Sequence, residues 1–283
     1  MATYDLLTPA LLLATFAIAF AIYCGLRVAG RKPQVTGVKH NQLFGPFLAG
    51  FLVWLIGPIE RLMVGRVSPN VITAMSLVVC VMTGVVVGLG DLTAAVWLYA
   101  IGGLLDVLDG RLARLSGKVT IRGALLDSVA DRWGEIAVFA GYAWLVRDSA
   151  WLLAVLGAFG GSMMVSYTRA RAEALGVAAN GGLMQRAERI VLVAVGTLVA
   201  AWYGENPDKL DYVLPIIGVT MLVCAVASSA TAIHRWIVAY RTLAAREQAA
   251  PAEVVAARPQ IPRPADIRAL PPLDPPPLHS RAR

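Results

Sequence analysis

Long uncharged stretches divide this chain into lengths suited to crossing a membrane. About 20 helical residues cross ~30 Å of hydrocarbon. Four uncharged runs reach that length: residues 6–26, 67–90, 149–168 and 212–234. Three shorter runs each continue into a charged segment on one side: residues 92–105, 136–146 and 190–204. We interpret the shorter runs as spans whose charged ends are buried in protein, so the pattern predicts seven membrane-spanning helices.

Residues 41–59 are also uncharged, but glycines and prolines interrupt them. They could form an eighth span, or an amphipathic helix or re-entrant segment in the membrane interface. With seven spans, 17 of the 25 Lys and Arg residues fall on one side, and only Arg147 and Lys209 on the other. The positive-inside rule then places the N-terminus outside and the C-terminus in the cytoplasm. An eighth span would distribute the charges over both sides, so we favour the interfacial segment.

Composition supports the membrane assignment. The chain is 58% hydrophobic and 15% charged, with a mean hydropathy of +0.66, which excludes an ordinary water-soluble domain and a largely disordered chain. The net charge of +7 follows from the charges beside the spans, so we expect no nucleic-acid partner. We expect three parts: an N-terminal anchor and basic linker (1–40), a membrane domain (41–246) and a disordered, proline-rich cytoplasmic tail (247–283).

Four acidic residues lie at the ends of two neighbouring predicted helices. Asp106 and Asp109 are three residues apart, and Asp127 and Asp131 four apart, so each pair lies on one helical face. A carboxylate at mid-bilayer costs at least ~2.5 kcal/mol. An antiparallel hairpin would bring the four together, and they stay ionised only if cations hold them. Oxygen ligands suit Mg²⁺, Mn²⁺ or Ca²⁺, and two such ions can promote displacement at phosphorus.

A structural hairpin is the alternative, with the acids paired to nearby basic residues: Arg111, Arg114, Lys118, Arg122 and Arg132. The glycines argue against it, because glycine inside a helix is destabilising by ~1 kcal/mol relative to alanine. Gly110 and Gly123 are better explained by close approach of the backbone to a ligand. Ala113 is small for the same reason, and Arg114, one turn further on, can bind a phosphate through two hydrogen bonds.

These residues form one motif: Asp106-x2-Asp109-Gly110-x2-Ala113-Arg114-x8-Gly123-x3-Asp127-x3-Asp131. The motif resembles the signature of the CDP-alcohol phosphotransferase family, with all eight fixed positions filled. The resemblance covers about residues 43–245 and includes Ser68-Pro69-Asn70-x-Ile72-Thr73 at the entry to the first core span. It implies an all-α polytopic membrane bundle of six core transmembrane helices, preceded by a cytoplasmic amphipathic helix, and a homodimer. The span at 6–26 is then an extra N-terminal helix.

The resemblance also implies roles for individual residues. Asp106, Asp109 and Asp127 are similar to the principal ligands of two divalent ions, Mg²⁺ or Mn²⁺. Asp131 is similar to the carboxylate that contacts the second ion and acts as the general base. Five further residues match positions around the cytidine and diphosphate of a CDP-linked donor: Thr73, Gly110, Ala113, Arg114 and Gly123.

A second basic cluster lies on the same side of the predicted membrane. Positive-inside anchoring is the simple explanation, but the segment Ser166–Glu173 followed by Arg186-x2-Arg189 resembles the phosphatidylinositol-phosphate synthase branch of the family. In that branch, matching residues bind the phosphate of inositol phosphate: Arg169, Arg186, Arg189 and Arg235. Arg169 stands where bacterial members often carry Lys, and Gln185 and Ala187 replace a more usual Glu and Pro.

The sequence therefore predicts a transferase of phospholipid biosynthesis in the inner cell membrane, with its active site facing the cytoplasm. It would move a phosphatidyl group from CDP-diacylglycerol to a polyol phosphate, foremost inositol phosphate, and release CMP. Glycerol 3-phosphate or neutral inositol are alternative acceptors. An ion or proton transporter is the alternative from another class, but the acids gather at one end, whereas spans 67–90 and 149–168 carry no charge.

Overall fold

The computed structural model describes residues 7–30, 45–179 and 181–249, and within these ranges the regular structure is helical, without strands. The elements are α1 (Leu7–Val28), α2 (Gly45–Met63), α3 (Pro69–Gly88), α4 (Leu92–Leu115), α5 (Ile121–Leu145), α6 (Leu152–Ala174), α7 (Arg186–Gly204), the 3₁₀ helix η1 (Pro207–Tyr212) and α8 (Val213–Ala249). The chain divides into two compact units after Ala239. The first contains α1–α7 and most of α8; in the second, the described residues 240–249 are helical.

The helices correspond to the predicted spans. Each of the seven predicted spans falls on one helix, α1 or one of α3–α8, and the interrupted segment 41–59 falls on α2. Among the described residues, four helical segments are long and apolar enough to cross a membrane: Pro69–Gly88, Leu92–Leu115, Arg186–Gly204 and Pro207–Gln248. The all-α, polytopic membrane class is confirmed, whereas the number of spans stays a prediction. Residues 31–44 of the predicted basic linker and 250–283 of the predicted tail lie outside the described residues. The tail was predicted to begin at residue 247, but residues 247–249 belong to α8 and are helical.

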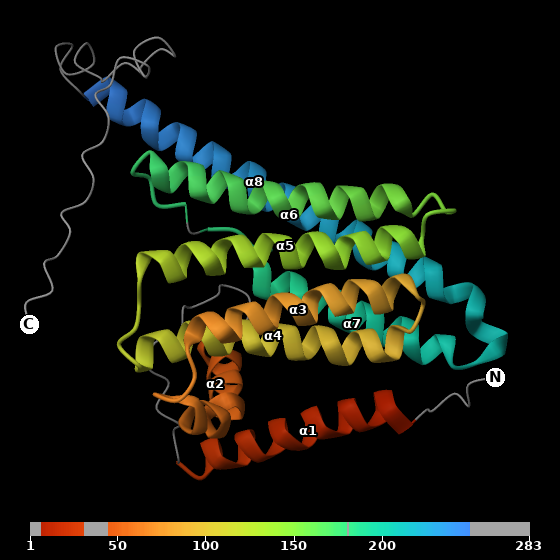
Figure 1. Ribbon diagram of the computed structural model, residues 1–283. Coiled ribbons are helices and arrows are strands. Elements are labelled where there is room, and N and C mark those ends of the chain that lie inside the picture. The colour runs from red at the N-terminus through yellow and green to blue at the C-terminus, as the bar shows by residue number, and fades with distance from the viewer. Residues whose placement is uncertain (1–6, 31–44, 180, 250–283) are drawn as a thin grey trace, which may run out of the picture. The chain divides into compact units, whose positions relative to one another are not determined.

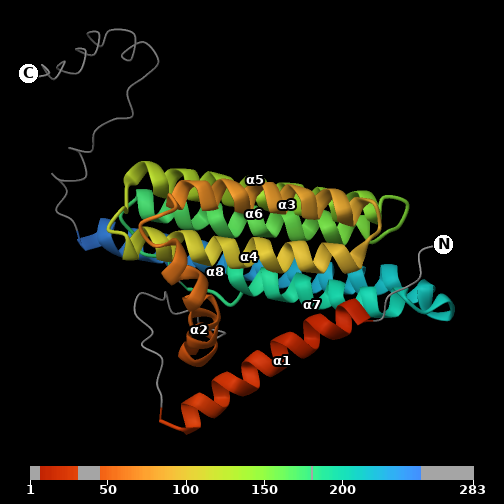
Figure 2. The ribbon, with the colours of Figure 1, turned by 60° about the horizontal axis from the view of Figure 1, so that its bottom comes forward.

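The helix α2 runs across the direction of α3–α6 in both ribbon views (Figures 1 and 2). It packs against α1 through aromatic side chains, of which Tyr23 and Phe51 are buried with ring centroids 5.6 Å apart. Pro58 lies inside α2, where it removes one backbone hydrogen bond. This crosswise placement supports the interfacial interpretation of residues 41–59.

The backbones of α3 and α5 approach each other directly. A Cβ atom added to Gly84 would lie 2.1 Å from the carbonyl oxygen of Ala137, and one added to Gly141 would lie 2.1 Å from the carbonyl oxygen of Gly84. Small residues allow such close helix packing within membranes. This contact fixes α5, and with it Asp127 and Asp131, beside α3.

The α4–α5 hairpin depends on local signals at its ends. Asp91 caps α4 by accepting a hydrogen bond from the backbone N–H of Ala94 at 2.9 Å. Gly117 has a φ of +63° after the end of α4, a conformation that favours glycine. Thr120 then caps α5 by accepting from the N–H of Gly123 at 3.0 Å. The short turn makes the two helices antiparallel, so the acid-bearing end of α4 and the first turns of α5 lie at the same end of the bundle (Figure 1).

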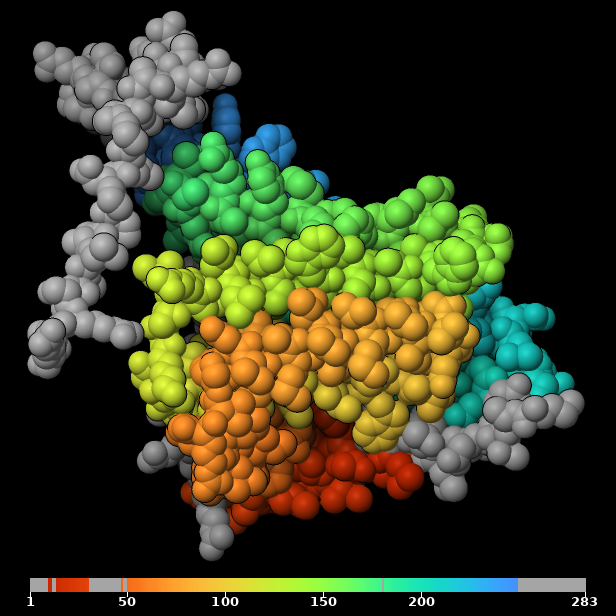
Figure 3. All heavy atoms as spheres, viewed as in Figure 1, coloured from red at the N-terminus to blue at the C-terminus, as the bar shows by residue number. Residues whose placement is uncertain are grey.

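The helices α3, α5 and α6 form one continuous face of the molecule (Figure 3). Exposed apolar side chains follow α3 along its length: Val71, Met75, Val78, Met82 and Val85. In a membrane-embedded chain such a face is solvated by lipid rather than by water. The polar groups described next lie between the helices.

Candidate active site

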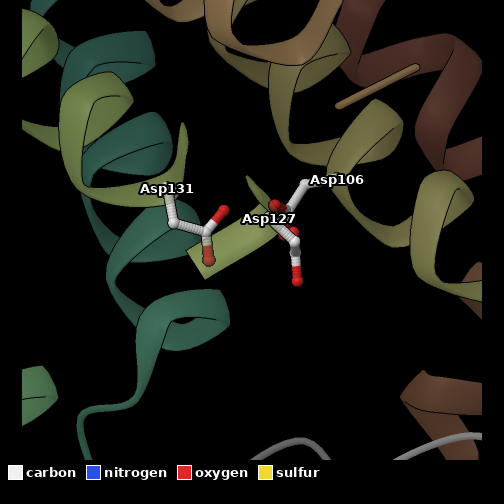
Figure 4. A group of neighbouring side chains, drawn as sticks. All are labelled: Asp106, Asp127 and Asp131. Atoms are coloured by element: carbon white, nitrogen blue, oxygen red, sulfur yellow. The ribbon is translucent and has the colours of Figure 1, made fainter. Parts of the chain in front are cut away.

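Three of the four acidic residues form a compact group. Asp106 on α4 and Asp127 and Asp131 on α5 each offer a carboxylate oxygen, and these oxygens lie within 4.8 Å of one another (Figure 4). Figure 4 shows the side chain of Asp131 directed toward the other two. Carboxylate oxygens from two helices at this spacing fit a hard divalent cation. The sequence predicted that the two pairs of acidic residues lie close together, and the structure shows this for Asp106, Asp127 and Asp131.

Asp109 completes the quartet from a different position. It is buried, with 4% of its surface exposed, and its Oδ2 accepts a hydrogen bond from the hydroxyl of Thr73 on α3 at 2.6 Å. Asp109 and Thr73 line a small cavity together with Asp106 and Asp131. Asp109 thus faces the same space as Asp106 and Asp131, and Thr73 orients it. The sequence predicted that Thr73 contacts the CDP-linked donor. In the structure its hydroxyl donates a hydrogen bond to the carboxylate of Asp109.

Arg186, at the first position of α7, lies against the acids. Its Nη1 donates to both Asp106 and Asp131, and the residue also lines the cavity. The guanidinium balances the charge of two carboxylates that come from different helices. One member of the predicted acceptor cluster is therefore in direct contact with the predicted metal ligands.

The other three arginines of that cluster contact protein groups. Arg189, 2% exposed, donates through Nη2 to Glu135. Arg235, 3% exposed, donates to the backbone carbonyls of Gly181 and Val165 at 2.7 and 2.9 Å. Arg169 pairs with Glu173 at 2.8 Å. Arg235 lies close enough to Arg169 and to Arg189 for their like charges to repel it.

Two buried donors of this cluster stand out. The Nε atoms of Arg186 and Arg189 are buried and have no hydrogen-bond partner in the part of the chain that the structure describes. A buried donor without a partner costs about 1–3 kcal/mol, more when the group is charged. Such donors are expected where an anion binds.

The residues predicted to surround the donor lie at the hairpin end. Arg114 is exposed and Ala113 half-buried. A Cβ atom added to Gly110 would lie 3.5 Å from Nη1 of Arg114, and one added to Gly123 would lie 3.0 Å from Oγ1 of Thr120. Without a Cβ atom, Gly110 and Gly123 leave their backbone accessible beside the polar side chains of Arg114 and Thr120. Such an arrangement suits the binding of a diphosphate. The role of these glycines in donor binding stays a prediction.

Two basic residues of the alternative structural hairpin pair with acids outside the quartet. Arg111 forms a buried, bidentate ion pair with Glu60 of α2, both contacts being 3.0 Å. Arg132 donates to Glu135 at 3.0 Å. Neither Glu60 nor Glu135 belongs to the residues that the sequence predicts for the site. The signal for Glu135 was present, because it follows Asp131 by four residues and so shares its helical face.

Comparison with known proteins assigns the chain to a family. The sequence model of the CDP-alcohol phosphatidyltransferase family matches residues 66–242. A phosphatidylinositol phosphate synthase of Streptomyces avermitilis is 30% identical over 246 residues, which cover 81% of this chain and 96% of that protein. The enzyme of the same name from Mycobacteroides abscessus is 38% identical over 145 residues, covering 50% of this chain and 61% of that protein. The chain therefore spans less than two thirds of the latter.

Solved structures give the same result. The crystal structure of Mycobacterium tuberculosis phosphatidylinositol phosphate synthase with CDP-DAG bound superposes with a TM-score of 0.56 and 33% sequence identity, covering 66% of this chain and 94% of that one. A second crystal structure of that protein, in complex with manganese and citrate, has the same score and identity and covers 65% and 88% of the two chains. The region that the family model matches, residues 66–242, contains α3–α7 and the complete acidic motif. The chain therefore belongs to the CDP-alcohol phosphatidyltransferase family.

Proposed function

We propose that this protein transfers a phosphatidyl group from CDP-diacylglycerol to a hydroxyl of inositol phosphate. The hydroxyl oxygen forms a new bond to the lipid-linked phosphorus, the bond from that phosphorus to CMP breaks, and the hydroxyl proton passes to the protein. The products are phosphatidylinositol phosphate and CMP. Relatives named phosphatidylinositol phosphate synthase, and the CDP-DAG bound in one of their structures, support this choice of substrates.

The contact of Arg186 with Asp106 and Asp131 is the observation that carries the proposal. It joins the arginine cluster to the acids, so an anion on the arginines would lie beside the group that receives the proton. The unpartnered Nε atoms of Arg186 and Arg189 are donors that a phosphate can satisfy. A neutral acceptor would offer these buried Nε donors no negative charge, whereas a phosphate would, and the arrangement therefore favours a phosphate-bearing alcohol.

Each acid would have its own task. Asp131 would accept the proton of the attacking hydroxyl, because a carboxylate within reach of that hydroxyl can act as a general base near neutral pH. Asp106, Asp109 and Asp127 would hold cations, and Thr73 would keep Asp109 turned into the cavity through its 2.6 Å hydrogen bond. The backbone at Gly110 and Gly123, with Ala113 and Arg114, would hold the CDP portion of the donor.

The acids fit a divalent metal by their chemistry and spacing, and we propose two Mg²⁺ or Mn²⁺ ions per site. Bound there, the ions would neutralise the diphosphate and favour the departure of CMP. The manganese in a related structure supports this assignment. The ions would be held by Asp106, Asp109, Asp127 and Asp131.

The location of the reaction follows from the charge pattern of the sequence. We place the protein in the inner membrane with the acid-bearing end of the bundle facing the cytoplasm, because 17 of the 25 basic residues fall on that side. We expect a homodimer, as the family resemblance implies. The domain limits 1–40, 41–246 and 247–283 belong to the same proposal.

A substrate panel tests the function. Purified protein with Mg²⁺ and labelled CDP-diacylglycerol is offered inositol phosphate, glycerol 3-phosphate, inositol and serine in parallel. We expect a lipid product and stoichiometric CMP with inositol phosphate. Product with glycerol 3-phosphate instead would reassign the acceptor, and no product with any alcohol, together with ion flux in proteoliposomes, would favour the transporter.

A further inference from the structure

We propose that Glu135 is a positioning residue for the acceptor phosphate: it fixes Arg189, and through it the arginine-bearing end of α7, against the acids of α5. The inference rests on the proposed function, since it concerns the same acceptor subsite. Glu135 lies outside the acidic motif and contacts neither Asp106 nor Asp131 in the described structure.

Both carboxylate oxygens of Glu135 are occupied by protein donors. Oε1 accepts from Nη2 of Arg189 on α7. Oε2 accepts from Nη1 of Arg132 at 3.0 Å and from the hydroxyl of Ser162 on α6 at 3.0 Å. Glu135 is 7% exposed and Ser162 0%. A carboxylate buried in a helical bundle is expensive, and this one joins α5, α6 and α7 at a single point.

The ion pair belongs to a series of polar contacts between α5 and α7. Asp131 pairs with Arg186, Glu135 with Arg189, and the hydroxyl of Tyr142 bonds that of Thr197. The contacts follow in the same order along both helices, so α5 and α7 run in the same direction. Glu135 is four residues after Asp131, and Arg189 three after Arg186, which places each pair on one face of its helix.

Arg189 is held from two sides. Its Nη2 contacts Glu135, and its Nη1 lies 3.4 Å from the carbonyl oxygen of Met184, just before α7 begins. This leaves Nε as the buried donor without a described partner. The carboxylate of Glu135 thereby sets which edge of the guanidinium is free for an anion.

Loss of the negative charge at position 135 has a defined consequence. Arg189 would stay buried without its counter-ion, and the nearest carboxylate along the α5 face is Asp131, which already pairs with Arg186. Arg189 would then compete with Arg186 for Asp131, while Arg186 keeps its contact with Asp106. Both guanidiniums would shift relative to a bound phosphate. Four of the five residues predicted to bind the donor lie at the α4–α5 turn: Gly110, Ala113, Arg114 and Gly123. The contacts described for Glu135 and Arg189 include none of them, so CDP-diacylglycerol binding should change little.

The test compares Glu135→Gln with Glu60→Gln. Glu60 is a matched control, because it is also a buried glutamate, 4% exposed, paired with a buried arginine, Arg111. Because Glu135 and Arg189 are in direct contact, their effects are coupled. We therefore expect Glu135→Gln to raise the KM for inositol phosphate by about tenfold, which corresponds to about 1.4 kcal/mol. The kcat and the KM for CDP-diacylglycerol should stay within about threefold of wild type. Glu60→Gln should lower the thermal unfolding temperature comparably without selectively raising the acceptor KM.

Two further variants keep the proposal testable if Glu135→Gln yields little folded protein. Glu135→Asp retains the charge on a shorter side chain and should restore most of the acceptor affinity. Ser162→Ala removes one hydrogen bond to Oε2 and should raise the acceptor KM by about two- to fivefold.

The outcomes separate the two proposals. If the wild type is active, three results would overturn the role of Glu135 and leave the function standing. These are an acceptor KM raised equally in Glu135→Gln and Glu60→Gln, an acceptor KM unchanged in Ser162→Ala, and an acceptor KM raised as much in Glu135→Asp as in Glu135→Gln. Wild type that forms no product with a phosphate-bearing acceptor would overturn the proposed function, and the role of Glu135 with it.

Discussion

Replacing Thr73 with valine separates two roles for this residue. Valine has nearly the shape of threonine but cannot donate to Asp109, whose Oδ2 lies 2.6 Å from the threonine hydroxyl. If Thr73 orients a metal ligand, the change should weaken metal binding. If it contacts the CDP-linked donor, as its sequence motif suggested, the change should raise the donor KM and leave metal binding intact.

The magnitude follows from the burial of the two residues. Thr73 is 5% exposed and Asp109 4%, so water cannot readily replace the lost donor. A hydrogen bond to a charged group contributes about 1.5–3 kcal/mol, and loss of a partner that orients a metal ligand costs about 10- to 100-fold in metal affinity. We therefore expect Thr73→Val to weaken Mn²⁺ binding by about 10- to 100-fold, and Thr73→Ser to bind Mn²⁺ nearly as well as wild type.

The assay is a titration of metal-free protein with Mn²⁺, with free Mn²⁺ followed by electron paramagnetic resonance and no substrate present. Thr83→Val is the matched control. Thr83 lies on the same helix, is 0% exposed, and donates at 2.8 Å to the carbonyl oxygen of Val79 one turn earlier. It therefore loses a buried hydroxyl of the same kind at a distance from the acids.

Unchanged Mn²⁺ affinity in Thr73→Val, measured beside a folded Thr83→Val control, would refute the reasoning. A raised KM for CDP-diacylglycerol in that variant would return Thr73 to the donor site. Equal losses of Mn²⁺ affinity in both valine variants would instead indicate a general effect on α3.

Three further predictions follow from the same structure. Asp131→Asn should abolish turnover and still bind CDP-diacylglycerol in a lipid-binding assay; wild-type rates would remove Asp131 from the role of base. Exhaustive chelation should stop the reaction and added Mg²⁺ or Mn²⁺ restore it; activity that persists in chelator would contradict the metal site. Gly84→Ala places a Cβ atom 2.1 Å from the carbonyl oxygen of Ala137 and should destabilise the protein by about 1–3 kcal/mol or more, seen as a lower unfolding temperature. Gly160→Ala, which meets nothing within 4 Å, is its control, and equal temperatures would argue against the α3–α5 contact.

Much of the fold could be predicted because hydrophobicity and charge act over whole segments. The uncharged runs coincide with helices, and the short runs are parts of longer helices: α4 continues from its apolar part through Asp106 and Asp109 to Leu115. The glycines at the α3–α5 contact were beyond prediction, because a residue that permits close packing carries no signal about which helix approaches it. Gly84 and Gly141 are two of 26 glycines.

The site was predictable where its residues repeat at helical spacing and was missed where partners come from distant segments. Asp127 and Asp131 share a face by their spacing alone. The partners Thr73 and Asp109 are separated by 36 residues, and Arg189 and Glu135 by 54. Local periodicity cannot link such positions, and the hydrogen bond of Thr73 to Asp109 became visible only once α3 and α4 were placed side by side.

Burial distinguishes arginines that anchor the protein in the membrane from arginines that bind an anion, which the sequence alone cannot separate. An arginine that anchors a membrane protein must reach water or lipid headgroups, as do Arg61 and Arg66, which are exposed and bond only carbonyls of their own turn among the contacts described. Arg189 and Arg235 are 2% and 3% exposed and cannot act in that way. Because a buried guanidinium is retained only where it is paired, their positive charge requires either protein acids or a bound anion. Glu135 supplies such a charge to Arg189, and the buried Glu188 interacts electrostatically with both arginines. The phosphate of the acceptor is the further anion that we expect to bind beside them.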